Sequence, residues 1–216
     1  MNKKVIITIV VIAVVLLVIV VWPIKIYNRL VKADESVSTA WSQVENVYQR
    51  RADLIPQLVA TVQGAADFEK STLDAVISAR AQATSVKLDP SNMTEADLQK
   101  FQAAQDNLSS SLSRLLVTVE RYPELKATQN FQTLQAQLEG TENRIAVERN
   151  KFNEVAKAYN VQIRRFPNNI VAGMFGFEKR AYFQAAPGAD KAPEVKFDFN
   201  SSNSSQNSAA PAQSAN

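Results

Sequence analysis

The sequence predicts an all-α protein, with an N-terminal transmembrane helix followed by an antiparallel bundle of three to four long helices. Three observations predict this class. An unbroken apolar run begins at Val5 and ends at Trp22. Apolar residues then recur every three or four positions, which is the period of an amphipathic helix. Late in the chain, apolar or aromatic residues recur every seventh position, which is typical of helices packed as in a coiled coil.

The apolar run, residues 5–22, predicts a single membrane-spanning anchor after a short flank of residues 1–4. Its only polar member is Thr8. As a helix the run would be about 27 Å long, close to the hydrocarbon thickness of roughly 30 Å. Trp22 occupies the place of an interfacial aromatic residue, and Tyr27 follows it, so both are predicted to lie at the membrane interface.

A cleaved signal peptide is the alternative interpretation of this run. Cleavage needs a small-x-small site after the apolar residues. The junction Val20-Val21-Trp22-Pro23-Ile24 offers no such site, so the sequence favours a retained, single-pass anchor in the cell membrane.

The charges flanking the anchor do not by themselves fix its orientation. The N-terminal side carries Lys3, Lys4 and the α-amino group, and the other side carries Lys25, Arg29 and Lys32. The cations therefore tie, and acidic residues count for little. A short N-terminal flank behaves most simply as an uncleaved signal anchor, so we expect the bulk of the domain on the non-cytoplasmic side.

The helical-bundle domain is predicted to occupy residues 23–170. Its first helical stretch carries an apolar stripe, and this stripe consists of Leu30, Val37, Trp41, Val44, Val47, Leu54, Leu58 and Val62. Pro56 predicts a bend, or a new helix if Asp53 caps it. Gly64 predicts a second break, after which Asp67 would cap a helix reaching Ala83.

Residues 87–92 predict a loop, and Thr94 predicts the start of the next helix. That helix should end at Tyr122, because the residue before Pro123 avoids the α region. The last long helix should cover residues 124–165, with Phe131, Leu138, Ile145, Phe152, Tyr159 and Phe166 recurring every seven positions. Residues 24–64 would span about 61 Å and residues 124–165 about 63 Å, and this match favours four helices over three.

The C-terminal part has a different composition. Residues 171–200 mix glycine with aromatic residues and predict an irregular flap that packs on the bundle or on the membrane. With four helices the last one returns to the membrane, which would place residues 173–183 close to the bilayer. Residues 201–216 contain no charged or aromatic residue and predict a disordered tail.

The composition excludes most enzyme chemistries. The chain has no Cys and no His, which excludes disulfides, thiol nucleophiles, imidazole bases and the usual metal sites of helical bundles. Its net charge is +3 without a single-sign block, so we expect no nucleic-acid partner. We expect no cofactor, no metal and no catalytic residue, because no nucleophile–base pair is visible.

Four polar residues fall in step with the apolar stripes and form the candidate buried polar network. They are Arg51, Glu69, Arg80 and Glu148. Such side chains either extend to the edge of the bundle or pair internally and fix the helix register.

Several motifs occur together in one order. They are Tyr27-Asn28-Arg29-Leu30-Val31, Ala40-Trp41-Ser42, Arg50-Arg51-Ala52-Asp53-Leu54-Ile55-Pro56, Tyr122-Pro123-Glu124-Leu125, Glu142-Asn143-Arg144-Ile145, Tyr159-Asn160, Phe166-Pro167 and Gly176-Phe177. In these motifs the chain resembles the LemA family. The resemblance implies a bacterial, membrane-anchored helical bundle without an established reaction. Members of this family include proteins implicated in building magnetosome membranes, and the genes of other members often lie near membrane-protease genes.

These observations predict a membrane-anchored scaffold or interaction protein of the bacterial envelope that is not an enzyme. Its expected partners are the lipid bilayer, unidentified membrane proteins and other copies of itself in a homo-oligomer. The alternative is an accessory factor of a membrane protease or of an envelope quality-control system.

Overall fold

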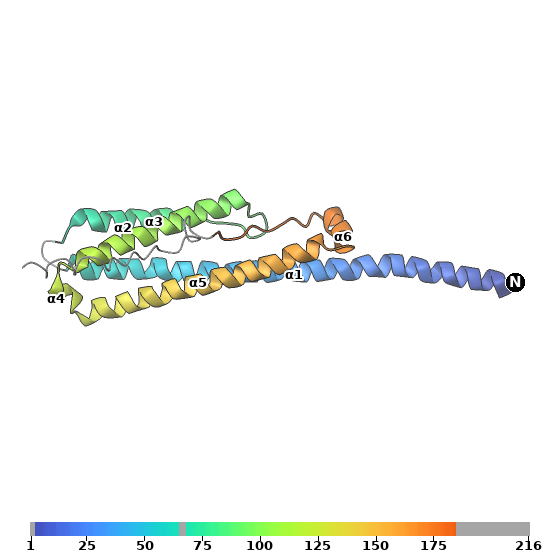
Figure 1. Cartoon of the computed structure of the whole chain (residues 1–216), viewed down its shortest axis with the longest axis horizontal. Coiled ribbons are helices and arrows are strands. Elements are labelled where there is room, and N and C mark those ends of the chain that lie inside the picture. The colour runs from blue at the N-terminus through green and yellow to red at the C-terminus, as the bar shows by residue number, and fades with distance from the viewer. Residues whose placement is uncertain (1–2, 65–67, 185–216) are drawn as a thin grey trace, which may run out of the picture. The chain divides into compact units, whose positions relative to one another are not determined.

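The computed structural model describes residues 3–64 and 68–184. These residues form six helices and no strand, and the helices are α1 (Lys3–Gln63), α2 (Lys70–Ser85), α3 (Glu95–Val119), α4 (Pro123–Lys126), α5 (Gln129–Arg164) and α6 (Asn168–Phe175) (Figure 1). The long helices α1, α2, α3 and α5 build the bundle. The prediction of an all-α protein with one long apolar N-terminal helix is confirmed.

Helix α1 runs without interruption for 61 residues through both Pro23 and Pro56. Its N-terminal part is long and apolar enough to cross a membrane, and those residues are exposed. No helix begins at Pro56, and Asp53 lies inside α1, where its carboxylate accepts a hydrogen bond from Gln49 at 2.8 Å. The alternative of a new helix at Pro56, capped by Asp53, was therefore wrong.

The physical reason lies in the packing around this proline. Pro56 removes one backbone hydrogen bond from the helix, but Ile55 and Leu58 beside it are almost fully buried. Burying two such side chains contributes about 3–6 kcal/mol, which offsets the loss.

The break at Gly64 is present, since α1 ends at Gln63. Asp67 lies outside the described residues, and the residue that precedes α2 is Glu69, whose side chain makes no capping hydrogen bond. After the loop, Thr94 caps α3 as predicted. Its hydroxyl accepts from the Asp97 backbone N–H, and the Asp97 carboxylate accepts from the Thr94 backbone N–H, which completes a capping box.

The predicted helix over residues 124–165 is divided in two. Helix α3 ends at Val119, and Pro123 opens the short α4 from its first position, where a missing N–H costs nothing. Thr128 then separates α4 from α5. Its hydroxyl accepts from the Phe131 backbone N–H at 3.4 Å, so a threonine that caps well starts a new helix here.

The helices run antiparallel in sequence order. Ion pairs join Arg51 in α1 to Glu142 in α5 and Arg121, just after α3, to Glu69, just before α2. The most extensive packing is between α1 and α5, and the next is between α2 and α3.

Two hydrophobic clusters fill the bundle. The proximal cluster, nearer the apolar run, is built mainly from Ile26, Leu30, Val37, Trp41, Val44, Tyr48, Leu98, Phe101, Ile145, Phe152, Ala156, Tyr159 and Ile163. The distal cluster is built mainly from Leu54, Ile55, Leu58, Val62, Leu73, Val76, Leu108, Leu112, Leu115, Val119, Phe131, Leu134 and Leu138.

The predicted flap begins as a helix. Residues 168–175 form α6, so the expected boundary between residues 170 and 171 falls inside this helix. Gly176 ends α6 in the left-handed conformation, with φ of 74°, which glycine adopts without strain. Residues 177–183, here called the strap, then lie extended along the bundle. Residues 185–200 of the predicted flap and the predicted tail lie outside the described residues.

Candidate functional site

A buried arginine organises the middle of the bundle. Arg51 is 1% exposed. Its Nη1 donates to Glu142 Oε1 at 2.6 Å and to Ser109 Oγ at 2.7 Å, and its Nη2 donates to Gln105 Oε1 at 2.5 Å. These four residues, here called the polar layer, come from α1, α3 and α5. A planar guanidinium suits them because it presents several donors in fixed directions.

The polar layer lies at the boundary between the two hydrophobic clusters. Along α1 the proximal cluster ends at Tyr48 and the distal cluster begins at Leu54. Along α5 the corresponding residues are Ile145 and Leu138, on either side of Glu142. The polar layer, which is centred on the almost fully buried Arg51, therefore separates the two apolar clusters. A shift of one helix along another would leave Arg51 without its acceptors, so the layer specifies the register.

Helix α2 is joined to the same region through backbone carbonyls. Gln105 Nε2 donates to the Ala83 carbonyl at 3.1 Å, and Arg80 Nε donates to the Ala52 carbonyl at 2.8 Å. Ala52 directly follows Arg51 in α1. All four bundle helices are thus connected within a few residues of the polar layer.

The structure brings only one of the four predicted polar residues into this layer. Arg51 is at its centre, whereas Arg80 is half-buried on α2 and bonds to the α1 backbone. The four predicted residues therefore do not form one network with each other in the described structure. A periodic pattern gives the face of a helix on which a residue lies, but it does not give the partner across the interface.

The other two predicted residues lie away from the layer. Glu69 is exposed beside the start of α2 and pairs with Arg121 at 3.4 Å. Glu148 pairs with Lys151 on the same helix at 2.7 Å. The Glu69–Arg121 pair is exposed on both sides and contributes about 0–1 kcal/mol, whereas the Glu148 side chain is only 20% exposed.

Sequence reasoning missed Ser109 and Glu142. Gln105 offered a signal, because it was the polar position within an otherwise apolar stripe of α3. Glu142 offered none from periodicity, since its side chain is 44% exposed and reaches inward from the edge of α5.

A second polar arrangement fastens the strap to α5. Asn160 exchanges two hydrogen bonds with the backbone of Arg180, at 2.9 Å to its carbonyl and 2.8 Å from its N–H. Asn153 does the same with Phe183, at 3.0 and 2.9 Å. The two asparagines lie seven residues apart on one face of α5. Each amide therefore supplies the paired hydrogen bonds that a neighbouring strand would give an extended chain.

The side chains of the strap connect it to other elements. Arg180 Nη2 donates to Asp34 Oδ1 in α1 at 2.6 Å, and Nη1 donates to the Ser91 carbonyl in the loop before α3. Phe183 stacks on Trp41 with ring centroids 6.0 Å apart. The strap is therefore part of the proximal core.

Two tyrosines in this region have raised pKa values. Burial, followed by the nearby Asp34 carboxylate, raises the pKa of Tyr159 to about 12. Burial also raises the pKa of Tyr48 above its ordinary value. Both groups are neutral at physiological pH, so neither supplies a base for catalysis.

The two predicted interface aromatics lie at the end of the apolar run. Trp22 is exposed. Tyr27 contacts Phe175 of α6 and Phe177 of the strap, with ring centroids 4.8 and 5.8 Å apart. The structure thus places the C-terminal aromatic segment against α1 just beyond the run.

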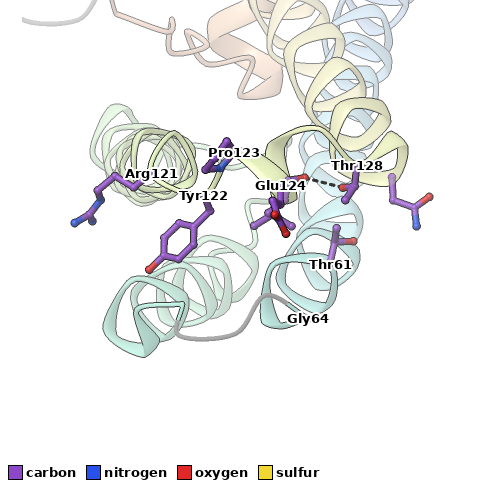
Figure 2. Close-up of a pocket in the computed structure, with 9 residues that line it drawn as sticks. Thr61, Gly64, Arg121, Tyr122, Pro123, Glu124 and Thr128 are labelled. Carbon is purple, nitrogen blue, oxygen red and sulfur yellow. Dashed lines mark hydrogen bonds between the residues drawn. The ribbon is translucent and has the colours of Figure 1, made fainter.

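A hollow of about 800 Å³ lies at the opposite end of the bundle, and its walls are formed by Thr61, Gly64, Arg121, Tyr122, Pro123, Glu124, Leu125, Thr128 and Asn130. Figure 2 shows Tyr122 and Thr61 on either side of Glu124. The Thr128 hydroxyl in its wall donates to the Leu125 carbonyl at 2.7 Å.

Across residues 3–64 and 68–184, no group of three or more acidic side chains is gathered closely enough to hold a metal ion. The described residues therefore define a class of protein. It is a helical-bundle protein in which the longest helix extends beyond the bundle as an apolar segment, and in which the buried Arg51 is bonded to Gln105, Ser109 and Glu142.

Comparison with known proteins agrees with this class. A family model described as the LemA family matches residues 40–197. "Magnetosome protein MamQ 2" of Paramagnetospirillum magneticum is 27% identical over 181 residues, covering 76% of this chain and 66% of that protein. "Protein LemA" of Metamycoplasma hominis is 23% identical over 159 residues, covering 74% of this chain and 69% of that protein.

"Magnetosome protein MamQ" of Magnetospirillum gryphiswaldense matches to the same extent as the Paramagnetospirillum protein. The chain spans 66% of the length of these magnetosome proteins. The family match covers well over half of the sequence, and the chain belongs to the LemA family.

Proposed function

We propose that this protein is a membrane-anchored scaffold, which holds a helical bundle against a bilayer and presents its surfaces to membrane proteins or to further copies of itself. One observation carries the proposal: α1 is a single helix that contains both the apolar run and residues of both hydrophobic clusters. A helix built in this way fixes the bundle to its anchor without a linker. The domain would lie on the non-cytoplasmic side of the cell membrane.

The interior of the bundle supports a structural role. Glu142, Gln105 and Ser109 each bond to Arg51, and this use of their polar atoms favours stabilisation over chemistry. The relatives reported above also include magnetosome proteins, and none of them is named as an enzyme.

Cross-linking in intact membranes, followed by affinity capture from detergent, tests the proposal. We expect cross-linked products that contain either several copies of this chain or other membrane proteins. A single protease captured in equal amount would instead support the accessory-factor alternative. Recovery of the chain mainly from the soluble fraction would contradict both.

A matched pair of variants links the result to the anchor. Val14→Arg places a charge in the middle of the apolar run, which costs about 2.5–3.5 kcal/mol of insertion free energy. Val117→Arg makes the same change at an exposed position of α3. We expect the first variant to lose the cross-linked products and the second to retain them.

A further inference from the structure

Helix α6 presents an apolar surface that the bundle leaves uncovered. One side of this helix is buried, since Val171 and Ala172 belong to the proximal cluster. The other side of α6 is exposed, and so is Phe166, which precedes Pro167 just before the helix. These exposed apolar residues, here called the α6 face, are Phe166, Ile170, Met174 and Phe175. No charged residue occurs in α6. Contiguous exposed apolar residues of this kind mark an interaction surface.

The position of the α6 face indicates what covers it. Phe175 packs on Tyr27 of α1, and Tyr27 lies five residues beyond Trp22, a rise of about 7.5 Å along the helix. Figure 1 shows α6 beside α1 in this region. The α6 face is therefore continuous with the exposed apolar run, at the level where a spanning helix leaves the hydrocarbon.

The charges around this level have one predominant sign. Residues 22–29 and 164–179 contain one acidic residue, Glu178, and five exposed basic residues. The basic residues are Lys25, Arg29, Arg164, Arg165 and Lys179. Aromatic and apolar residues bordered by Lys and Arg are typical of segments that lie in the headgroup region, where anionic lipids attract the cations.

We propose that the α6 face lies in the headgroup region of the same bilayer that holds residues 5–22, as a second point of attachment, with the surrounding cations against anionic lipid. This inference rests on the proposed membrane anchoring. A second copy of the chain is a poorer fit. A two-fold pairing would bring the same surface together with itself, and would place the two sets of cations against each other.

Spin labels on the full chain test this proposal in vesicles of phosphatidylcholine and phosphatidylglycerol. The chain contains no Cys, so Met174→Cys, Val117→Cys and Val14→Cys each give a single labelling site. Met174 and Val117 are a matched pair, because they are 75% and 70% exposed and Val117 lies at the distal end of α3. Val14 lies within the apolar run and reports on anchoring alone.

We expect the ratio of relaxation by oxygen to relaxation by a water-soluble nickel complex to be several-fold higher at position 174 than at position 117. Equal ratios at these two positions, with a high ratio at position 14, would overturn the proposal and leave the anchor intact. A low ratio at position 14 would overturn the anchor and the proposal together.

Two further measurements identify the contact. Vesicles without phosphatidylglycerol should give a lower ratio at position 174, and an unchanged ratio would overturn the part assigned to the cations. Spectral broadening at position 174 that disappears on dilution with unlabelled protein, together with a low oxygen ratio, would show a second copy on the α6 face and overturn the lipid contact.

Discussion

At the scale of single residues, Arg51 shows how one charge can specify a whole bundle. The two hydrophobic clusters on either side of it are stabilised by apolar contacts, which are non-directional and therefore discriminate less sharply against sliding of the helices by a turn. The guanidinium does not tolerate it, because each of its bonds requires an acceptor at a fixed place. The apolar residues supply most of the stability, and the arginine selects one alignment.

Replacing the acidic partner of Arg51 tests this role. Glu142→Gln keeps the shape of the side chain but removes the charge facing the guanidinium. Since Glu142 is half-exposed, we expect the free energy of unfolding to fall by about 1.5 kcal/mol, which is the lower end of the range for hydrogen bonds to charged groups. Chemical denaturation measures this change. Glu139→Gln, on the exposed face of the same helix, should change the value by less than about 0.5 kcal/mol.

Tyr159 gives the protein a sensitivity to alkali. Its pKa is raised from 10.0 to about 12, so the folded state retains a proton that the unfolded state loses. Stability is therefore unaffected by this group below pH 10 and falls as the pH rises from 10 towards about 12. We expect Tyr159→Phe to show a shallower fall over this range in denaturation experiments. Some decline should remain because the pKa of Tyr48 is raised as well. An identical decline in parent and variant would contradict the assignment.

At the scale of secondary structure, each long helix has an apolar stripe that the core covers. Leu112 in α3 lies in the distal cluster and Ile145 in α5 lies in the proximal cluster. Both side chains are almost fully buried, so truncating either one would lose the transfer free energy of the removed atoms and would also leave a cavity in the core.

We expect Leu112→Ala and Ile145→Ala each to lower the free energy of unfolding by about 2–5 kcal/mol. Thermal or chemical denaturation of the full chain in detergent measures the change. Val117→Ala provides the control, because this residue is exposed on the same helix as Leu112 and should have little effect. Unchanged denaturation midpoints for both core variants would show that the stripes do not form the core.

Periodicity was sufficient to predict the stripes, and local glycine, loop and capping signals were sufficient for the breaks near Gly64 and Thr94, because all of these depend on residues close together in the chain. It was insufficient at Pro56, where tertiary packing maintains the helix through a residue that weakens it locally. It was also insufficient at Thr128, where a preference for capping divides an otherwise continuous heptad pattern.

The polar layer could be predicted only in part, for a different physical reason. Arg51 stood out because a charge lay in an apolar stripe, but its partners are 54 to 91 residues away in sequence. The asparagines that fasten the strap were harder to recognise, since Asn153 and Asn160 bond to the backbone of a segment with no regular pattern of its own. Pairing across a fold depends on relative positions that periodicity does not encode.

At the scale of the whole described unit, the continuity of α1 is the decisive feature. It makes the anchor and the bundle one mechanical element, although Pro23 lies at their junction. A proline at this place would often serve as a hinge.

A distance measurement tests whether Pro23 acts as one. Spin labels at Leu17→Cys and Glu35→Cys stand 18 residues apart, which is five full turns, so both point from the same side of α1. If the helix is continuous, pulsed dipolar spectroscopy should give one narrow distribution with a backbone separation of about 27 Å. A hinge would give a broad distribution extending to shorter distances. Labels at Glu35→Cys and Asp53→Cys are also 18 residues apart, but no proline lies between them. The width of their distance distribution is the reference for an uninterrupted helix.

A continuous α1 would also behave as a lever. About 40 residues of this helix extend past Trp22, which is roughly 60 Å of rigid rod. Spanning helices commonly tilt by about 20° to match the thickness of their bilayer, and a change of that size would carry the far end at Gln63 sideways by roughly 20 Å. Small differences in membrane thickness would thus be magnified into large displacements of the distal end.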